Sequence, residues 1–290
     1  MYIVFLVFGK DYINYQQALF SMFTFLSQMK EEDKIIVLTD HPDYFNIIKD
    51  RIIISKLNES TLTEWKGDHQ FFWRIKIKAL QLIAKQWNDK PFLYLDADTF
   101  LFEDFNSIKT KLSQGYNLMH LNEGKLSELQ SKTEKLMWHQ LKNTSHGSIN
   151  IDSNTCMWNA GAIAVSNDRV EVLQLALDIC DSMCMQQVTP RLIEQLAFSI
   201  ALQTNNKLEA IDNCVGHYWG NKKQWNEKIS EFFSYNLMTS LSINEQIKKT
   251  TTIKFNAIPV IIKVPNTRLR LIKKVTHWFP NKYQTFIRKE

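Results

Sequence analysis

The stretch Pro-Phe-Leu-Tyr-Leu-Asp-Ala-Asp-Thr-Phe-Leu-Phe-Glu-Asp-Phe, residues 91–105, decides how the rest of the chain is interpreted. Its apolar run, residues 92–95, is typical of a buried strand, and two carboxylates, Asp96 and Asp98, follow directly. Because side chains alternate along extended backbone, both carboxylates can point the same way, at the strand end where open α/β sheets bind ligands. Adjacent carboxylates repel each other unless a cation lies between them, and oxygen ligands suit Mg²⁺ or Mn²⁺. Aspartates that only cap a turn are the alternative.

Two classes of enzyme use Asp-x-Asp after an apolar strand, and the first is the haloacid-dehalogenase-like phosphatases. Residues 96–99 resemble their Asp-x-Asp-x-Thr motif, although Thr99 comes one position early. In that family the first aspartate attacks phosphorus and the second is the general acid or base. A second acidic cluster after a later strand is also needed there, whereas Asp178 and Asp181 fall in a segment with a helical pattern, residues 173–185. A phosphatase is therefore a minor alternative.

Three further segments match the order and spacing of motifs from the second class, the glycosyltransferases. They are Trp-Asn-Ala-Gly-Ala-Ile-Ala-Val (158–165), Glu-Gln-Leu-Ala-Phe-Ser-Ile (194–200) and His-Tyr-Trp-Gly-Asn-Lys-Lys-Gln-Trp (217–225). With the Asp-x-Asp motif, they make the chain resemble the GT-A glycosyltransferases over about residues 1–230. The resemblance is to family 8 in particular, the glycogenin and lipopolysaccharide galactosyltransferase-like group. The third segment departs from that family's His-Phe/Tyr-x-Gly-x-x-Lys-Pro-Trp at Gln224, where proline is usual.

This resemblance implies one α/β domain with a twisted, mostly parallel sheet flanked by helices. It also implies a hexosyltransferase that uses a nucleotide diphosphate sugar, UDP-glucose or UDP-galactose, and retains the anomeric configuration. The acidic-Gln pair, Glu194 and Gln195, would lie beneath the donor sugar, and Asn159 and Gly161 would belong to the donor site. The competing interpretation is a homologue that binds the nucleotide sugar without transferring it.

The third segment also predicts a metal site on chemical grounds. His217 offers an imidazole nitrogen, which with Asp96 and Asp98 completes a set of ligands for Mn²⁺ or Mg²⁺. Gly220 lets the backbone pass close to a phosphate, and Lys223 supplies a positive charge for the diphosphate leaving group. A histidine among aromatic residues is otherwise more often a core or surface residue. The test of the prediction is whether His217 lies close to both carboxylates.

The amino-terminal residues predict another wall of the donor site. Residues 2–8 are an apolar run that predicts the first strand, and in the resembling family the loop after this strand, here Phe8 and Gly9, holds the nucleotide base. Asp40 follows the second predicted strand, residues 34–38, and either approaches the base or ribose or caps a turn. The loop at Gly9 lacks the Gly-rich phosphate cradle of the nucleotidylyltransferases, which disfavours nucleotidyl transfer.

A helical segment with several basic residues, residues 71–87, precedes the Asp-x-Asp strand. Arg74 and Lys78 are four positions apart and share a helical face. The resembling family places a basic residue on this helix that reaches the phosphate or sugar of the donor. Arg74 and Lys78 are therefore the predicted donor-binding residues, and Lys76 is assigned to a solvated face.

Length and composition fit one catalytic domain, residues 1–250, with an extension, residues 251–290. The chain has 290 residues, of which 44% are apolar, so it can bury a large core. Its four cysteines do not have the pattern of a zinc site and predict reduced thiols, and residues 2–8 are too short for a signal or a span. Both features favour a cytoplasmic protein. The polar residues 122–155 predict an excursion that builds the acceptor pocket.

The extension concentrates positive charge. Residues 263–290 carry eight basic residues against one acid, a net charge of +7, while the remainder has a net charge of −2. Apolar and aromatic residues share one helical face there, which predicts a peripheral contact with the inner face of a membrane, where a glycan or lipid-linked acceptor is presented. A basic helix packed on the catalytic domain is the alternative. Nucleic acid is disfavoured, because no recognised binding module accompanies the charge.

Overall fold

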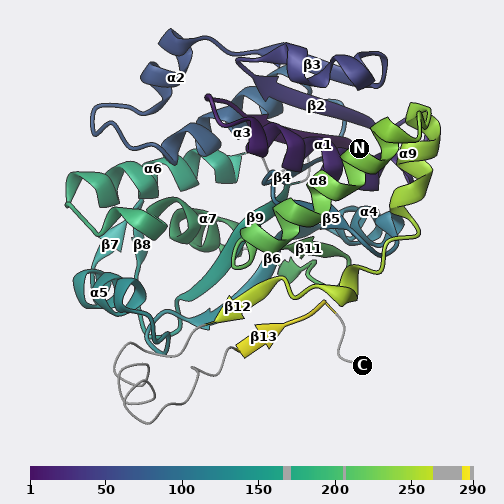
Figure 1. Ribbon diagram of the computed structural model, residues 1–290. Helices are drawn as coiled ribbons and strands as arrows, with labels where there is room; N and C mark the ends of the chain where they lie inside the picture. Colours follow the sequence, from purple (N-terminus) through teal and green to yellow (C-terminus); the bar gives the residue numbers. More distant parts are fainter. Residues whose placement is uncertain (166–170, 205–206, 264–282, 288–290) are drawn as a thin grey trace.

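A seven-stranded central sheet organises the molecule (Figure 1). The computed structural model describes residues 1–165, 171–204, 207–263 and 283–287. Within these residues the strand order is β10-β6-β9-β4-β1-β2-β3. The strands are β1 (Tyr2–Val7), β2 (Lys34–Thr39), β3 (Ile52–Lys56), β4 (Phe92–Leu95), β6 (Tyr116–Lys125), β9 (Cys156–Val165) and β10 (Lys207–Ala210).

Most neighbouring strands of this sheet are parallel. Strand β1 pairs in parallel with β2 and β4, β2 with β3, and β10 with β6, whereas β9 runs antiparallel to both β4 and β6. The apolar runs of β1, β2 and β4 are buried almost throughout, as expected for strands covered on both faces. The predicted α/β class with a mostly parallel sheet is therefore confirmed.

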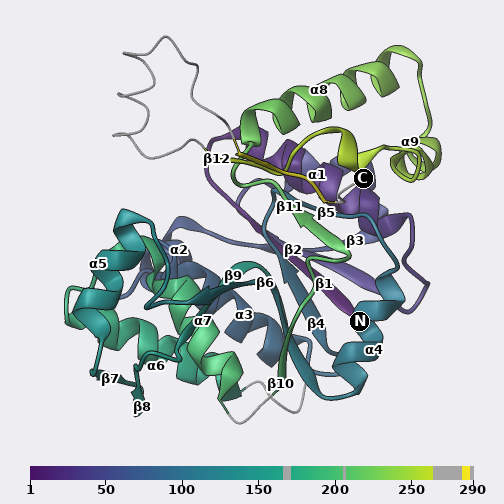
Figure 2. The same ribbon diagram turned by 90° about the horizontal axis from the view of Figure 1, so that it is seen from below.

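Helices cover both faces of the sheet, and β1 shows how its residues divide between them (Figure 2). Ile3 and Phe5 belong to the core shared with α1, α4 and α9, and Val4 belongs to the core shared with α3, α6 and α7. This alternation is the period-two pattern of a strand. The helices are α1 (Tyr12–Leu26), α2 (Glu59–Trp65), α3 (Arg74–Gln86), α4 (Phe105–Ser113), α5 (Lys132–Leu141), α6 (Glu171–Met185), α7 (Ile193–Gln203), α8 (Lys222–Met238) and α9 (Ile243–Thr250).

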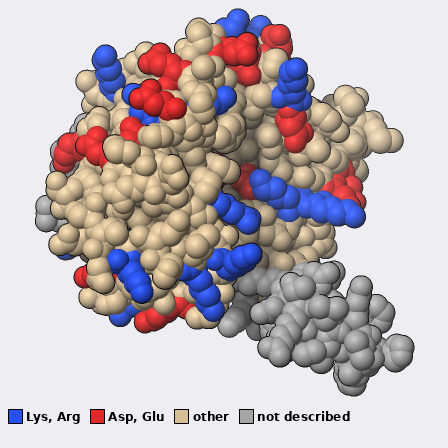
Figure 3. Space-filling view, turned by 90° about the vertical axis from the view of Figure 1, so that its left-hand side faces the viewer, with Lys and Arg blue, Asp and Glu red and all other residues tan. Residues whose placement is uncertain are grey.

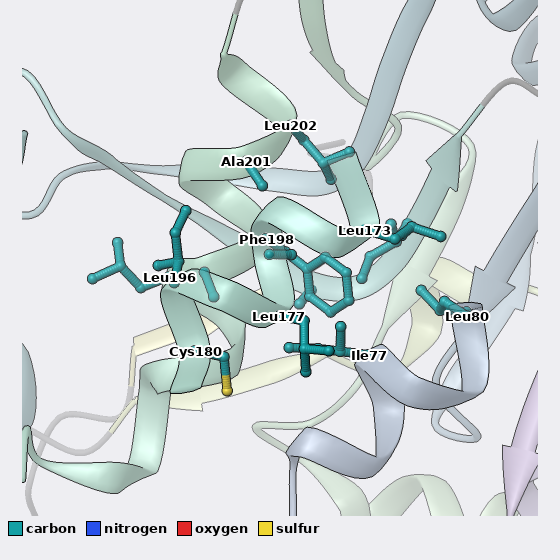
Figure 4. Packing of buried hydrophobic residues seen from close by; sticks show 14 of the residues in the cluster. Ile77, Leu80, Leu173, Leu177, Cys180, Leu196, Phe198, Ala201 and Leu202 are labelled. Carbon is teal, nitrogen blue, oxygen red and sulfur yellow. The ribbon is translucent and has the colours of Figure 1, made fainter. Parts of the chain in front are cut away.

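Close packing of α3, α6 and α7 fixes the helices that border the site (Figure 4). Ile77 from α3, Leu177 from α6 and Phe198 from α7 are buried in one cluster. The segment containing Asp178 and Asp181 is helical as predicted, because α6 presents an apolar stripe to this core. Side chains on the opposite faces of α3 and α7 are consequently held in fixed orientations.

A second, smaller ribbon lies beside the main sheet. Strands β5 (Thr99–Leu101) and β11 (Val215–His217) pair antiparallel, and an aromatic cluster packs behind them. The ring of Phe100 stacks on Trp225 and on Phe255, with centroid distances of 4.6 Å in both cases. This stack anchors the start of α8 next to the Asp-x-Asp segment, and residues from the extension, such as Val260, complete the same cluster.

The remaining elements are short. Residues 122–155 contain the end of β6, the helix α5 and a hairpin of β7 (Ser145–His146) and β8 (Ile149–Asn150), so the predicted excursion has secondary structure of its own. In the extension, β12 (Ile261–Lys263) pairs with β13 (Tyr283–Thr285). Single-turn or irregular 3₁₀ segments are η1 (Pro42–Arg51), η3 (Pro190–Leu192) and η4 (Phe255–Ala257).

Two further expectations concern the cysteines and the membrane. All four cysteines are free, with Cys180 and Cys214 buried and Cys156 and Cys184 partly exposed. Among the described residues, no helix has both the length and the apolar character needed to cross a bilayer. The predicted basic amphipathic helix falls mostly in residues 264–282, which lie outside the described ranges.

Candidate functional site

The two carboxylates lie where β4 ends, next to the β11 ribbon. The Asp96 amide donates to the carbonyl of Gly161 on β9 (2.8 Å), and the Tyr218 amide donates to the carbonyl of Asp98 (3.1 Å). These two backbone bonds hold the Asp-x-Asp turn between β9 and the end of β11. Asp98 is 5% exposed, while Asp96 is half-buried.

His217 completes a three-residue cluster, as the sequence predicts. Its Nε2 lies 3.4 Å from Asp98 Oδ1, and potential ligand atoms of Asp96, Asp98 and His217 all lie within 4.8 Å of one another. Two carboxylate oxygens and an imidazole nitrogen fit Mn²⁺ or Mg²⁺. The spacing also fits, because a single ion with bonds of a little over 2 Å can reach ligand atoms this close together.

The orientation of the His217 ring is set from β9. Nδ1 of His217 lies 2.9 Å from Oδ1 of Asn159, an oxygen that can only accept, so Nδ1 is the donor and Nε2 is the ring nitrogen available to a metal ion. Gly161 makes room for the ring, since a Cβ at this position would lie 2.2 Å from His217 atoms. The Asn-Ala-Gly motif therefore acts by supporting the histidine.

Two lysines neutralise the carboxylates. Lys222 Nζ, at the start of α8, lies 2.9 Å from Asp98 Oδ2. Lys76 Nζ, on α3, lies 3.0 Å from Asp96 and 3.0 Å from Glu194 Oε1, and it donates to the carbonyl of Ala160 (3.2 Å). The assignment of Lys76 to a solvated face is thus wrong: its side chain is only 11% exposed.

These contacts shift the protonation equilibria of the cluster. Burial alone would raise the pKa of Asp98, but His217 and Lys222 outweigh burial and hold the pKa well below its usual range. Burial alone would lower the pKa of Lys76, but Asp96 and Glu194 outweigh it and hold the pKa above the ordinary value. Burial raises the pKa of Glu194. The charged state of each carboxylate and lysine in the cluster therefore depends on its charged neighbours.

The other basic residues predicted for the donor site lie elsewhere. Arg74 donates from Nε and Nη2 to the carboxylate of Asp181 on α6 (2.6 and 2.9 Å), and with Lys78 it lines a separate hollow. Since residues on a helix are about 100° apart, Arg74 and Lys78 face away when Lys76 faces the carboxylates. The sequence contained a signal for Lys76, which precedes the buried Ala79, Leu80 and Ile83 at helical spacing.

A similar one-residue correction applies to the segment after His217. Lys223 is exposed and does not line the hollow at the carboxylates, whereas Lys222 does. Gly220 forms a bridge with Ile261 of β12, and a Cβ there would lie 2.9 Å from that side chain. Close packing against β12 thus accounts for Gly220 in this structure.

The predicted residues at the amino-terminal wall do come together. The Gly9 amide donates to both carboxylate oxygens of Asp40 (3.2 and 3.1 Å), and the Tyr15 hydroxyl donates to Asp40 Oδ1 (2.8 Å). Phe8 lines the hollow at the carboxylates, whereas Gly9 and Asp40 are not among its lining residues and hold the backbone next to Phe8 through their hydrogen bond.

Two adjoining hollows meet at the cluster. The first, with a volume of about 360 Å³, is bordered by Phe8, Lys76 and Glu194, and the second, of about 440 Å³, is bordered by Glu123 and Trp219. Residues shared by both include Asp96, Asp98, Asn159, Gln195, His217 and Lys222. Glu194 and Gln195 lie in the first turn of α7, the helix start that the sequence predicts. The arrangement can accommodate two ligands that meet over Gln195.

A mostly parallel sheet with an Asp-x-Asp turn at its edge and a histidine supplied by a second ribbon defines the class: this chain has the GT-A fold. Two solved structures with this fold are similar to it. One is the galactosyltransferase LgtC in complex with donor and acceptor sugar analogs, with a TM-score of 0.50 and 13% identity, covering 80% of this chain and 94% of that chain. The other is an active-site glutamine-to-glutamate mutant of LgtC, with a TM-score of 0.54 and 12% identity at the same coverage. No protein-family model and no curated protein matches the sequence significantly.

Proposed function

We propose that this protein is a metal-dependent glycosyltransferase that moves a hexose from a nucleotide diphosphate sugar to a hydroxyl of an acceptor. The observation that carries the proposal is the cluster of Asp96, Asp98 and His217 at the sheet edge of a GT-A fold, where two hollows meet. LgtC, a galactosyltransferase with donor and acceptor sugar analogs bound, has a similar fold. A UDP-sugar, UDP-glucose or UDP-galactose, is the proposed donor.

The first hollow is the proposed donor site. Asp96, Asp98 and His217 would hold Mn²⁺ or Mg²⁺, which when bound polarises the diphosphate and stabilises its developing charge. Lys222, next to Asp98, takes the role of neutralising the departing diphosphate that the sequence assigned to Lys223. Phe8, braced by Gly9 and Asp40, forms the wall for the nucleoside.

Glu194 and Gln195 are the proposed residues beneath the transferred sugar. Gln195 borders both hollows, and Glu194 is buried and held by Lys76. In the transfer, the bond from the anomeric carbon to the diphosphate oxygen breaks with its electron pair leaving on oxygen. The acceptor hydroxyl oxygen forms the new bond to that carbon, and its proton passes to the departing diphosphate. Retention of configuration remains part of the proposal, because the resemblance to family 8 implies it.

The second hollow is the proposed acceptor site. Its lining combines hydroxyl and carboxylate groups, such as Ser131 and Glu134, with Trp219, whose side chain is 45% exposed. Hydrogen-bonding groups beside an exposed aromatic ring suit a sugar, which has polar edges and an apolar face. The proposed acceptor is a glycan or a lipid-linked glycan.

A peripheral contact with the inner face of a membrane is proposed for the basic segment within residues 264–282. Outside that segment, lysine and arginine side chains are interspersed with aspartate and glutamate on the face drawn in Figure 3. Such a mixed surface does not favour nucleic acid, whose binding needs a continuous basic face. The positive charge that distinguishes the chain lies instead in its extension.

The deciding experiment is a panel of nucleotide sugars with Mn²⁺, scored for release of the nucleotide and for transfer to glycan acceptors. We expect one UDP-hexose to be turned over, and we expect Asp98→Asn to lower the rate by about 100-fold or more, since metal stabilisation of the leaving group is worth several kcal/mol. Asp178→Asn is the control, because that aspartate lies on α6 outside both hollows. Tight binding of a UDP-sugar without release of nucleotide would support the non-catalytic alternative and overturn the proposal.

A further inference from the structure

A β-bulge on β6 places one acidic residue out of the regular alternation of the strand. Asn122 pairs with Trp158 and Gly124 pairs with Met157, so Glu123 is the extra residue between two consecutive partners on β9. Gly124 has φ of +105°, a backbone conformation that bulges commonly need. Bulges next to active sites redirect side chains, and here the redirected side chain is a carboxylate.

This carboxylate binds two amide side chains of the site. Oε1 of Glu123 accepts from Nδ2 of Asn159 (3.2 Å), and Oε2 accepts from Nε2 of Gln195 (2.9 Å). An ionised carboxylate can only accept hydrogen bonds, so both amides must turn their NH₂ groups toward it. Glu123 thereby constrains the orientation of both amides.

For Asn159 the consequence reaches the metal cluster. With its NH₂ group on Glu123, its Oδ1 is left to accept from Nδ1 of His217 (2.9 Å) and from the Gly161 amide (3.0 Å). With Nδ1 as the donor to Asn159, a bound metal ion would take Nε2, the nitrogen that faces Asp98. If Asn159 were flipped, two donors would face each other at His217.

For Gln195 the consequence concerns the two hollows. Its NH₂ group is held by Glu123, so its Oε1 is turned away from Glu123 at the junction of the hollows. A carbonyl oxygen of fixed orientation there can face the positive charge that develops on a sugar ring during transfer.

We propose that Glu123 is a positioning residue that sets, through two amides, both the tautomer of His217 and the direction of the Gln195 carbonyl. The role of Glu123 in directing the Gln195 carbonyl rests on the proposed glycosyl transfer. Its role in setting the His217 tautomer does not, because that concerns only the residues that would bind the metal. Glu123 acts through its neighbours and needs no contact with the reacting atoms.

The test compares Glu123→Gln with Glu128→Gln, which makes the same charge change at an exposed site five residues further on. A glutamine at 123 presents one NH₂ group of its own and so forces one of the two amides to flip. We expect Co²⁺ or Mn²⁺ affinity by calorimetry to fall about 10- to 100-fold, the usual effect of losing an outer-shell partner. We expect ¹⁵N shifts of the His217 ring to change from the Nδ1–H form to a mixture. Glu128→Gln should match the wild type in both.

The second part of the test measures the steady-state kinetics of sugar transfer. At saturating metal, Glu123→Gln should lower kcat while leaving the KM for the donor within a few-fold, because a misdirected Gln195 carbonyl affects the transfer step more than the binding of the donor. Glu123→Asp, which is also an acceptor only, should keep the Nδ1–H tautomer if it folds, as checked by near-UV circular dichroism. Combined with Gln195→Met, Glu123→Gln should add little further loss in kcat, since the two residues act in series.

The outcomes separate the two proposals. If Glu123→Gln has the metal affinity and the His217 tautomer of the wild type, Glu123 is not a positioning residue. If these two readouts change as expected but no nucleotide sugar is turned over by the wild type, the glycosyltransferase proposal fails and the role of Glu123 in the ligand set stands.

Discussion

The Asp98 carboxylate contacts both His217 and Lys222. The contact with Lys222 places a positive charge inside the proposed metal site. Lys222 Nζ is 2.9 Å from Asp98 Oδ2, while its side chain remains 49% exposed. A metal ion on Asp98 would lie beside this ammonium group and be repelled by it. The same charge would attract the diphosphate of a bound donor, so the two ligands should respond to Lys222 in opposite directions.

Replacing this lysine should therefore have effects of opposite sign. In Lys222→Met, we expect metal affinity without nucleotide to rise several-fold, about 1 kcal/mol, the size expected for a partly exposed charge pair. We expect the affinity for a UDP-sugar in the presence of metal to fall. Calorimetry of both steps measures this, with Lys223→Met as the matched variant that removes the same charge one residue away. If Lys223→Met reproduces both changes and Lys222→Met does not, the sequence-based assignment to Lys223 is the correct one.

His120 should make the stability of the protein dependent on pH. Burial and the nearby His217 lower the pKa of His120 to about 3, and its Nδ1 has no hydrogen-bond partner among the described residues. In the unfolded chain the pKa is about 6.5, so the unfolded state takes up the proton first. Keeping His120 neutral therefore favours the folded state fully above about pH 6.5. This part of the free energy of unfolding is lost progressively as the pH falls toward 3.

The corresponding measurement is urea unfolding at pH 7 and pH 5. The free energy of unfolding of the wild type should fall over this range by up to about 2 kcal/mol from His120 alone. His120→Gln, which can still donate to the carbonyl of Val215, should show a smaller fall. An equal pH dependence in both proteins would contradict this account of His120.

At the scale of the elements, β9 and β11 approach each other closely enough that one position must be glycine. The missing Cβ of Gly161 on β9 would lie 2.2 Å from the ring of His217 on β11. The two strands belong to different sheets, so no ladder of hydrogen bonds sets their separation. The packing of His217 on Gly161 and the hydrogen bond from the same ring to Asn159 limit it instead.

Gly161→Ala should consequently displace the His217 ring. We expect a loss of about 1–3 kcal/mol in the free energy of unfolding from overpacking, and a loss of about tenfold or more in metal affinity. The double variant with His217→Ala should recover most of the stability, because the clashing ring is gone. Additive losses in the double variant would show that the strain lies elsewhere.

At the scale of the whole molecule, the charge of the extension contrasts with that of the remaining residues. Residues 263–290 carry a net charge of +7, while the rest carries −2. Near an anionic leaflet each basic residue contributes about 1 kcal/mol, so several together can hold a protein there reversibly. Because Ile261 bridges to Gly220, deleting everything after residue 260 would also disturb the start of α8.

Charge substitution is therefore a cleaner test of membrane contact than truncation. We expect the wild type to sediment with vesicles that contain anionic lipid, and a variant with Arg268, Arg270, Lys273 and Lys274 changed to glutamine to bind more than tenfold more weakly. The control changes the four lysines within residues 125–142 to glutamine. Equal weakening by both sets would indicate attraction by net charge and remove the specific role of the extension.

Much of the architecture follows from the sequence alone, because its signals lie within short contiguous segments. The apolar run before Asp96 and the helical stripe of α6 each depend on local periodicity, and the acidic-Gln pair at the start of α7 is a short contiguous motif. Such patterns report which side of an element is buried. Together with the motifs that resemble family 8, they were sufficient to predict the fold and the three residues of the Asp-Asp-His cluster.

Which neighbouring residue reaches the site was decided only by the tertiary structure. Lys76 replaces Arg74 and Lys78, and Lys222 replaces Lys223, because one helical residue corresponds to a rotation of about 100° that depends on how the helix packs on the sheet. Glu123 escaped prediction for a related reason. Its direction comes from a bulge, which inserts a residue into the strand and breaks the alternation on which any sequence-based assignment of faces depends.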